Sequence, residues 1–173
     1  MKPARAYKTA TPTPPQSSRT VRPGASRRAQ WAWLAVASAA VLLFVVLKLY
    51  SVNVVVEDAH LYFNMALLVN KGLIPHRDFF YTHPPLHLYL AALVFRLFGY
   101  SLALGKSLPN AALLIGGILV FTVGRRALGS AEGALACAIF LLSYDPLRIS
   151  SHYTGGNLTF ALAMAGLWLA YID

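Results

Sequence analysis

WAWLAVASAAVLLFVVLKLY, residues 31–50, is a run of 20 residues with one charged side chain, Lys48. At 1.5 Å of rise per residue, a helix of this length measures about 30 Å, the hydrocarbon thickness of a bilayer. Trp31, Trp33 and Tyr50 stand near its ends, where aromatic side chains favour the membrane interfaces, and Lys48 lies close enough to one end to extend toward water. The run therefore predicts a transmembrane helix.

The residues before this run form a basic tail. Residues 1–30 carry seven Lys or Arg and no acid, and they are rich in Pro, Ser and Thr, so we expect them to be disordered. Arg27 and Arg28 place the tail in the cytoplasm and residue 51 outside. A signal-peptide core has only about 7–15 apolar residues, so the run is expected to be an uncleaved anchor. No folded nucleic-acid-binding domain is recognisable beside the tail, so nucleic acid is not an expected partner.

The rest of the chain indicates an all-α membrane protein with about four transmembrane helices. The full chain is 57% hydrophobic and 12% charged, and a soluble domain carries about twice that share of charge. Cys137 is the single cysteine and is expected to be buried, so there is no disulfide framework. Small residues around Gly116 and Gly117, with Ala111, Ala112 and Ser107, predict close helix packing. Together with the first run, the expected spans are 31–50, 102–124, 131–146 and 158–173.

The segment 51–101 is expected to be an outer loop that carries two interfacial helices. The first, 57–72, would begin with Asp58 as its N-cap and end at Gly72. The second, 84–99, would hold Pro84 and Pro85 in its first turn. Both are too short or too polar to cross a bilayer.

The positive-inside rule leaves one alternative topology open. If 84–99 stays at the surface, Arg125 and Arg126 lie inside. If 84–99 crosses, Arg96, Lys106 and Arg148 lie inside instead, and that arrangement fits the rule at least as well. Length favours the first topology.

The outer loop concentrates the ionisable groups, around the stretch PHRDFFYTHPPL at 75–86. A carboxylate can act as base on an acceptor hydroxyl, and a cation can hold a departing phosphate, so this composition suits transfer from a phosphorylated lipid. Each group also has a structural alternative: Glu57 and Asp58 as favourable charges at a helix N-terminus, and Asp78 as a turn former.

A metal-binding site is a less favoured interpretation of the same loop than transfer from a phosphorylated lipid. His83 and His87 are spaced i, i+4, which permits a shared metal ion if both are helical. Pro84 and Pro85 lie between them and no third ligand is evident. We therefore expect no metal and no required cofactor, with a divalent cation as the alternative.

An acidic pair after the first span, an amphipathic helix, and then PHRDFFYTHPPL with YL and LFG behind it resemble the amino-terminal part of the GT-C superfamily of polytopic glycosyltransferases. The resemblance is greatest to bacterial relatives of protein O-mannosyltransferases and of lipid A aminoarabinose transferase, and it covers residues 31–173. It implies inverting transfer of a sugar from a polyprenyl-phosphate donor to a lipid, glycan or protein acceptor on the outer face of the bacterial inner membrane.

The resemblance also implies roles for individual residues. The family's acidic pair is usually Asp-Glu, and here it is reversed as Glu57-Asp58; we favour Asp58 as the catalytic carboxylate, with Glu57 as the alternative. The family's Lys before the Pro pair, which meets donor phosphate, is His83 here. Further candidates are Lys71, Arg77 and Asp78 for the phosphate, and Asn157 or Asp145 for a second acidic position after the third span.

The family's enzymes have many more spans than four, so we expect this chain to be an incomplete piece of such an enzyme. Two other classes stay open. One is a small non-catalytic membrane protein that binds lipid or a partner through its outer loop. The other is a transporter fragment, although a transporter would carry ionisable groups or broken helices at mid-membrane, where these spans are nearly free of charge.

Overall fold

The computed structural model describes residues 26–51, 57–149 and 155–170 of the 173-residue chain. This described part is built from helices joined by short connections, without a strand. The predicted all-α class is therefore confirmed. The helices are α1 (Arg27–Tyr50), α2 (Glu57–Asn70), α3 (Leu86–Phe98), α4 (Leu102–Ala127), α5 (Ser130–Leu142), α6 (Tyr144–Ile149) and α7 (Gly155–Ala170).

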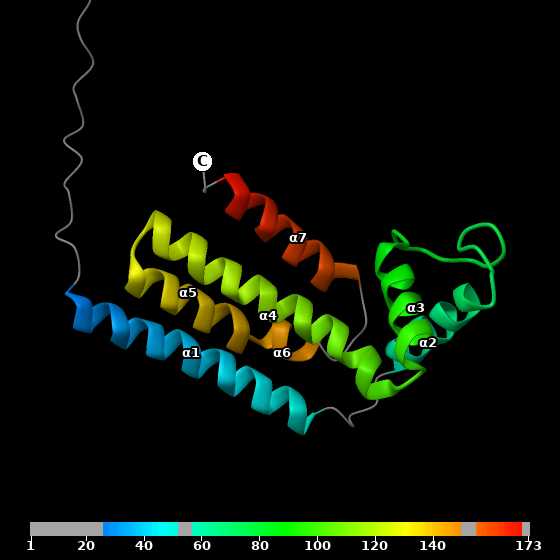
Figure 1. The fold of residues 1–173 in the computed structure, drawn as a ribbon, viewed down its shortest axis with the longest axis horizontal. Helices are drawn as coiled ribbons and strands as arrows, with labels where there is room; N and C mark the ends of the chain where they lie inside the picture. The colour runs from blue at the N-terminus through cyan, green and yellow to red at the C-terminus, as the bar shows by residue number, and fades with distance from the viewer. Residues whose placement is uncertain (1–25, 52–56, 150–154, 171–173) are drawn as a thin grey trace, which may run out of the picture.

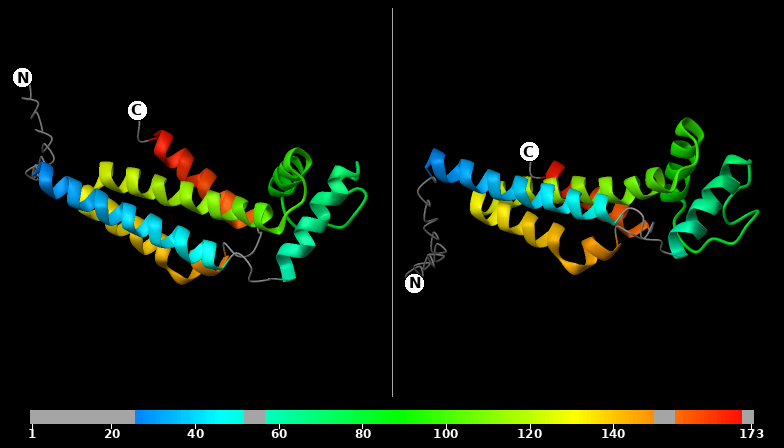
Figure 2. Two further views of the ribbon diagram at one scale, coloured as in Figure 1. Left: turned by 60° about the horizontal axis from the view of Figure 1, so that its bottom comes forward. Right: turned by 90° about the horizontal axis from the view of Figure 1, so that it is seen from below.

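Four helices lie side by side in the order α1, α5, α4, α7, and neighbours along the chain run in opposite directions (Figure 1). The short helix α6 follows α5 at one end of this layer. Helices α2 and α3 pack against each other beyond that same end (Figure 2). The segment 84–99 therefore does not lie among the four helices, as the favoured topology predicted.

Two helices are long and apolar enough to cross a membrane, judged by length and composition over the described residues. These are α1 with 24 residues and α4 with 26. Helices α5, with 13 residues, and α7, with 16, are apolar but shorter. The third predicted span, 131–146, is shorter than expected because its helix ends at Leu142. Asp145 and Pro146 do not close it but stand in the first turn of α6, where Pro is tolerated.

The first helix begins earlier than predicted. It starts at Arg27, four residues before the apolar run, because the hydroxyl of Ser26 accepts a hydrogen bond from the backbone N–H of Ala29 at 3.3 Å. This is the usual contact of a serine N-cap. The rest of the predicted basic tail, residues 1–25, lies outside the described residues.

Helices α2 and α3 match the two predicted interfacial helices, with shifted starts. Because α2 begins at Glu57, Asp58 stands in its first turn and is not the N-cap. Gly72 follows the end of α2 with a φ of +89°, a conformation that favours glycine. Pro85 is the N-cap of α3, so the two prolines precede its first turn and do not form it.

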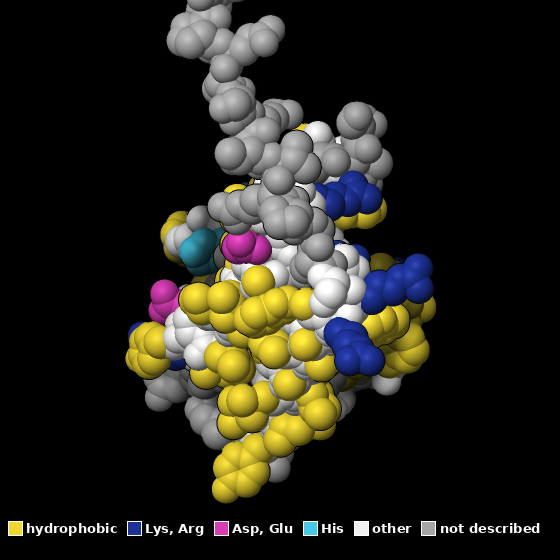
Figure 3. Space-filling view, turned by 90° about the vertical axis from the view of Figure 1, so that its left-hand side faces the viewer, with side chains coloured by type: hydrophobic (Ala, Val, Ile, Leu, Met, Phe, Trp, Pro, Cys, Tyr) yellow, Lys and Arg dark blue, Asp and Glu magenta, His cyan; other side chains and the backbone are white. Residues whose placement is uncertain are grey.

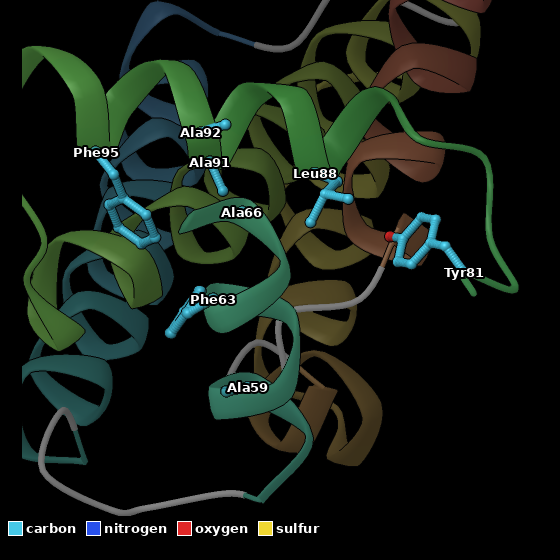
Figure 4. Packing of buried hydrophobic residues seen from close by; sticks show 8 residues of the cluster. All are labelled: Ala59, Phe63, Ala66, Tyr81, Leu88, Ala91, Ala92 and Phe95. Carbon is cyan, nitrogen blue, oxygen red and sulfur yellow. The ribbon is translucent and has the colours of Figure 1, made fainter. Parts of the chain in front are cut away.

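A compact hydrophobic core joins α2 to α3 (Figure 4). The rings of Phe63 and Phe95 meet edge to face, with centroids 5.5 Å apart. Phe63 also lies against α4 at Gly105, where a Cβ atom would stand only 2.5 Å from the ring. The buried members of this core are Ala59, Phe63, Ala66, Tyr81, Leu88, Ala91, Ala92 and Phe95.

Glycines let α4 approach its two neighbours closely. A Cβ atom on Gly117 would stand 2.7 Å from Leu141 of α5, and one on Gly116 would stand 2.9 Å from Phe160 of α7. Ala112 is buried beside them, while Ala111 and Ser107 are exposed, so the predicted small face covers less of α4 than expected. Cys137 is buried, as predicted.

Lys48 does not extend toward the interface, as its position near the helix end had suggested. Its side chain is buried, its Nζ donates to the carbonyl oxygen of Leu147 in α6, and it stands 5.7 Å from the centre of the Phe44 ring. The last carbonyls of a helix lack partners within that helix, and Lys48 supplies one. This contact ties α6 to α1.

We expect Gly133→Ala to destabilise the protein, because a Cβ atom there would stand 2.6 Å from the backbone nitrogen of Arg125 and 2.8 Å from the carbonyl oxygen of Phe121. Backbone atoms cannot move aside unless α5 separates from α4, and overpacking of this kind costs about 1–3 kcal/mol. Gly166→Ala is the matched control, because nothing lies within 4 Å of its Cβ position. Thermal unfolding in detergent should show a lower midpoint for Gly133→Ala only; equal midpoints would contradict the packing.

Candidate functional site

A cluster of five aromatic rings lies where α2, the 71–85 connection and the start of α3 meet. Neighbouring ring centroids are 5.7 to 6.3 Å apart. All five side chains can exchange or share a proton, which sets this cluster apart from the hydrophobic core beside it. We call it the His–Tyr cluster; its members are Tyr62, His76, Tyr81, His83 and His87.

Hydrogen bonds define the protonation of His87. Its Nδ1 lies 3.1 Å from the carbonyl oxygen of Pro84, which can only accept, so Nδ1 carries the hydrogen. Its Nε2 then accepts from the hydroxyl of Tyr81 at 2.5 Å. Burial lowers the pKa of His87, and the nearby charge of His83 lowers it further. Burial also raises the pKa of Tyr81 above its usual range, so the pair is neutral near pH 7.

His83 is an exposed imidazole of the cluster, as is His76. The Nε2 of His83 lies 2.9 Å from the hydroxyl of Tyr62 in α2. This hydrogen bond with α2 positions His83, which the sequence predicted as a phosphate ligand. His83 precedes α3, which begins at Leu86, so the condition that both His83 and His87 be helical is not met. Among the described residues, no group of three or more His, Cys, Asp and Glu side chains could hold a metal ion.

Two cavities meet at His87. One, of about 260 Å³, lies between His83 and His87 on one side and Gly155, Gly156 and Thr159 of α7 on the other. Gly155 permits this approach, since a Cβ atom there would stand 3.2 Å from Nδ1 of His87. The first N–H groups of α7 have no partners within the helix and carry partial positive charge, so this cavity suits an anion.

The second cavity is smaller and largely apolar. It measures about 150 Å³ and lies between α3, α4 and α7, where His87 and the buried Asn157 both line it. The structure therefore brings two sequence-predicted residues, His83 and Asn157, to two sides of His87. Asp145, the alternative to Asn157, is exposed in α6 and is not among the described residues that line either cavity.

Arg77 and Asp78 stabilise the turn at residues 74–78, within the 71–85 connection. The guanidinium of Arg77 donates to both oxygens of Asp78 at 2.9 Å, and Asp78 also accepts from the backbone N–H of Ile74 at 2.8 Å. The hydrogen bond from Arg77, with that from Ile74, lowers the pKa of Asp78 to about 2. The turn-forming role of Asp78 is thus confirmed, and Arg77 is engaged with it.

Asp58 and Lys71 stand at opposite ends of α2. Glu57 and Asp58 open α2, with side chains that lie outside the described part of the structure. Lys71 follows the last residue of α2 and is exposed. Thirteen residue steps at 1.5 Å place it about 20 Å along the helix from Asp58.

Sequence reasoning missed Tyr62, His76 and Tyr81 as members of the site, and it named His87 only as a possible metal ligand. Tyr62 stands four residues after Asp58, and this i, i+4 spacing on a helix is the signal that could have found it. No comparable signal marks Tyr81, because the turn through Pro84 and Pro85 brings it to His87.

Comparison with protein families, with curated proteins and with solved structures found no match to this chain.

We expect Asp78→Asn to loosen the connection and speed chymotryptic cleavage after Phe79 and Phe80, because the ion pair with Arg77 is lost. The folded pKa of Asp78, about 2, lies below the unfolded value of about 3.9, so the protection is present above pH 3.9 and is lost as the pH falls through about 2. Asp145→Asn, on an exposed carboxylate in α6, is the control. Unchanged cleavage in Asp78→Asn would contradict this role.

We expect the stability of the protein to fall as the pH drops below about 6.5, partly through His87. Burial lowers the folded pKa of His87, so below the unfolded value of about 6.5 the unfolded chain binds more protons than the folded one. The stability is therefore fully present above about pH 6.5 and decreases toward the folded pKa. Unfolding midpoints measured between about pH 8 and pH 5 should vary less in His87→Leu than in the parent; an equal pH dependence would contradict a neutral His87.

Proposed function

We propose that this chain is the amino-terminal part of a membrane glycosyltransferase that takes a sugar from a polyprenyl-phosphate donor and passes it to an acceptor at the outer membrane surface. The observation that carries the proposal is the cavity of about 260 Å³ that His83 and His87 line together with Gly155 and Gly156 at the start of α7. Such a lining suits a phosphate. The sequence resemblance to the GT-C superfamily supplies the reaction.

In this proposal α1, α4, α5 and α7 are the four spans of a protein of the bacterial inner membrane. They lie side by side, each runs opposite to the one before it along the chain, and α2 and α3 pack beyond one end (Figure 1). The opposite end carries Arg27 and Arg28 at the start of α1 and Arg125 and Arg126 at the end of α4. That end faces the cytoplasm under the positive-inside rule, so the His–Tyr cluster faces out.

The catalytic carboxylate is assigned to Asp58. It stands four residues before Tyr62 in α2, on the same face of the helix, and Tyr62 contacts His83. Glu57 lies one position earlier, about 100° around the helix, and is the alternative. Lys71 is about 20 Å from Asp58 along α2 and Arg77 is paired with Asp78, so both are weaker phosphate ligands than His83.

The reaction is a single displacement with inversion. The acceptor hydroxyl transfers its proton to Asp58 while its oxygen bonds to the anomeric carbon. The bond from that carbon to the phosphate oxygen breaks, and its electron pair stays on the phosphate. Protonated His83 and the first N–H groups of α7 would stabilise this anion. The reaction requires no cofactor. Stabilisation of the phosphate by a bound divalent cation is the alternative.

We expect Asp58→Asn to lower sugar transfer by about 10²–10⁴-fold, the usual contribution of a general base. His83→Gln should weaken donor binding, and His83→Lys should preserve it because a permanent cation replaces the imidazole. The measurement is transfer from a labelled polyprenyl-phosphate sugar in membranes that contain the protein. Glu132→Gln is the control, expected to stay near the parent rate because Glu132 stands in the first turn of α5, at the other end of the helix layer (Figure 1).

Full transfer in Asp58→Asn and in Glu57→Gln would exclude both carboxylates. Unchanged donor binding in His83→Gln would exclude His83 as a phosphate ligand.

One observation favours the non-catalytic alternative. The loop tip exposes apolar side chains, with Phe80 82%, Ile74 41% and Leu73 38% exposed. Such a patch suits a membrane surface or a partner protein. If no transfer occurs and Phe80→Ser still abolishes capture of a partner or lipid, the chain is a binding protein of this kind.

A further inference from the structure

A groove runs between α1 and α4 from the end of the bundle that lies opposite the His–Tyr cluster. At that end is a cavity of about 290 Å³, lined by Arg27, Gln30, Trp31, Arg125 and Ser130. Along the helices follows a second cavity of about 520 Å³. Leu34 and Phe121 line both cavities, so the two adjoin.

The end cavity has the chemistry of a phosphate site. Arg27 comes from α1 and Arg125 from α4, and both line this one cavity with Gln30 and Ser130. Among the residues that the structure describes, no carboxylate forms an ion pair with either arginine. Guanidinium groups bind phosphate through two parallel hydrogen bonds and shed water more readily than ammonium groups.

The continuing cavity has the chemistry of an acyl chain site. Its walls are apolar side chains of α1 and α4, such as Val41 and Ile118, and Cys137 of α5 also lines it. It extends along α1 from Leu34 to Val45, eleven residue steps or about 16 Å. Figure 3 shows the end face, where Lys and Arg side chains gather on one side and hydrophobic side chains cover much of the rest.

We propose that this groove holds an anionic glycerophospholipid, with its phosphate between Arg27 and Arg125 and one acyl chain along α1 and α4. Trp31, which is 69% exposed and lines the end cavity, stands at the level of the headgroup, where tryptophan favours the interface. The two arginines in the lining of one cavity favour an anionic lipid over a zwitterionic lipid or an apolar helix. The site rests on α1 and α4 crossing a membrane and is independent of sugar transfer.

The test uses the full chain, purified in detergent and exchanged into nanodiscs that contain phosphatidylglycerol and phosphatidylcholine in equal amounts. Native mass spectrometry then measures the ratio of the two lipids retained. The parent should retain phosphatidylglycerol preferentially. Arg27→Gln with Arg125→Gln should lower this preference by about tenfold or more, because both contacts with the phosphate are lost.

Three further variants make the test specific. Arg28→Gln removes an exposed arginine beside Arg27 that does not line the cavity, and it should leave the preference unchanged. Arg27→Lys with Arg125→Lys keeps the charge and should retain most of the preference. Ser38→Trp fills the apolar part and should lower retention of both lipids, since Ser38 lines that cavity.

Several outcomes would overturn the site. These are equal retention of the two lipids by the parent, an equal loss in Arg28→Gln, or a delipidated protein that dimerises through this face. Thermal unfolding in the same detergent identifies any variant that fails to fold. If the glutamine double variant does not fold, the variant Arg27→Lys with Arg125→Lys provides the test. Loss of the preference for phosphatidylglycerol in this lysine variant, when it is folded, also overturns the site. None of these readouts involves sugar transfer, so the proposed function is tested separately.

Discussion

The contact of the Phe63 ring with α4 at Gly105 positions the α2–α3 pair against the rest of the molecule. A side chain at Gly105 would enter the ring, so glycine there is what allows α2 to lie against the start of α4. Phe63 is fully buried, and burial of such a side chain contributes about 1.5–3 kcal/mol. Because α3 packs on α2 through the same core and leads directly into α4, this contact holds His87 beside the start of α7.

Helix α4 is the shared support of both candidate sites. It packs against α5 and α7, receives the α2–α3 pair at one end, and supplies Arg125 at the other. Its glycines make this possible, since Gly116 accommodates Phe160 and Gly117 accommodates Leu141. Helices that meet this closely gain dispersion contacts, which are the main attraction available between helices in lipid.

The charged groups of the chain divide into structural and chemical roles according to their surroundings. Lys48 caps the carbonyl of Leu147, and Arg77 pairs with Asp78, so these three charges are used within the fold. His83 remains exposed and is held by Tyr62, while burial keeps His87 neutral. A neutral buried imidazole positions its neighbours, and an exposed one can take up a proton to meet an anion.

The sequence by itself determined the helical class, the place of each long helix and the presence of two shorter helices between residues 57 and 99. Apolar run length, prolines and a terminal glycine are local signals, and each acts within a few residues. Only the tertiary structure decided which polar groups meet. Lys71 and Asp58 are near in sequence but at opposite ends of a rigid helix, whereas Tyr81 meets His87 across a proline turn, and Asn157 reaches His87 because α7 packs beside α3. Packing between distant segments sets these distances, and no local pattern encodes it.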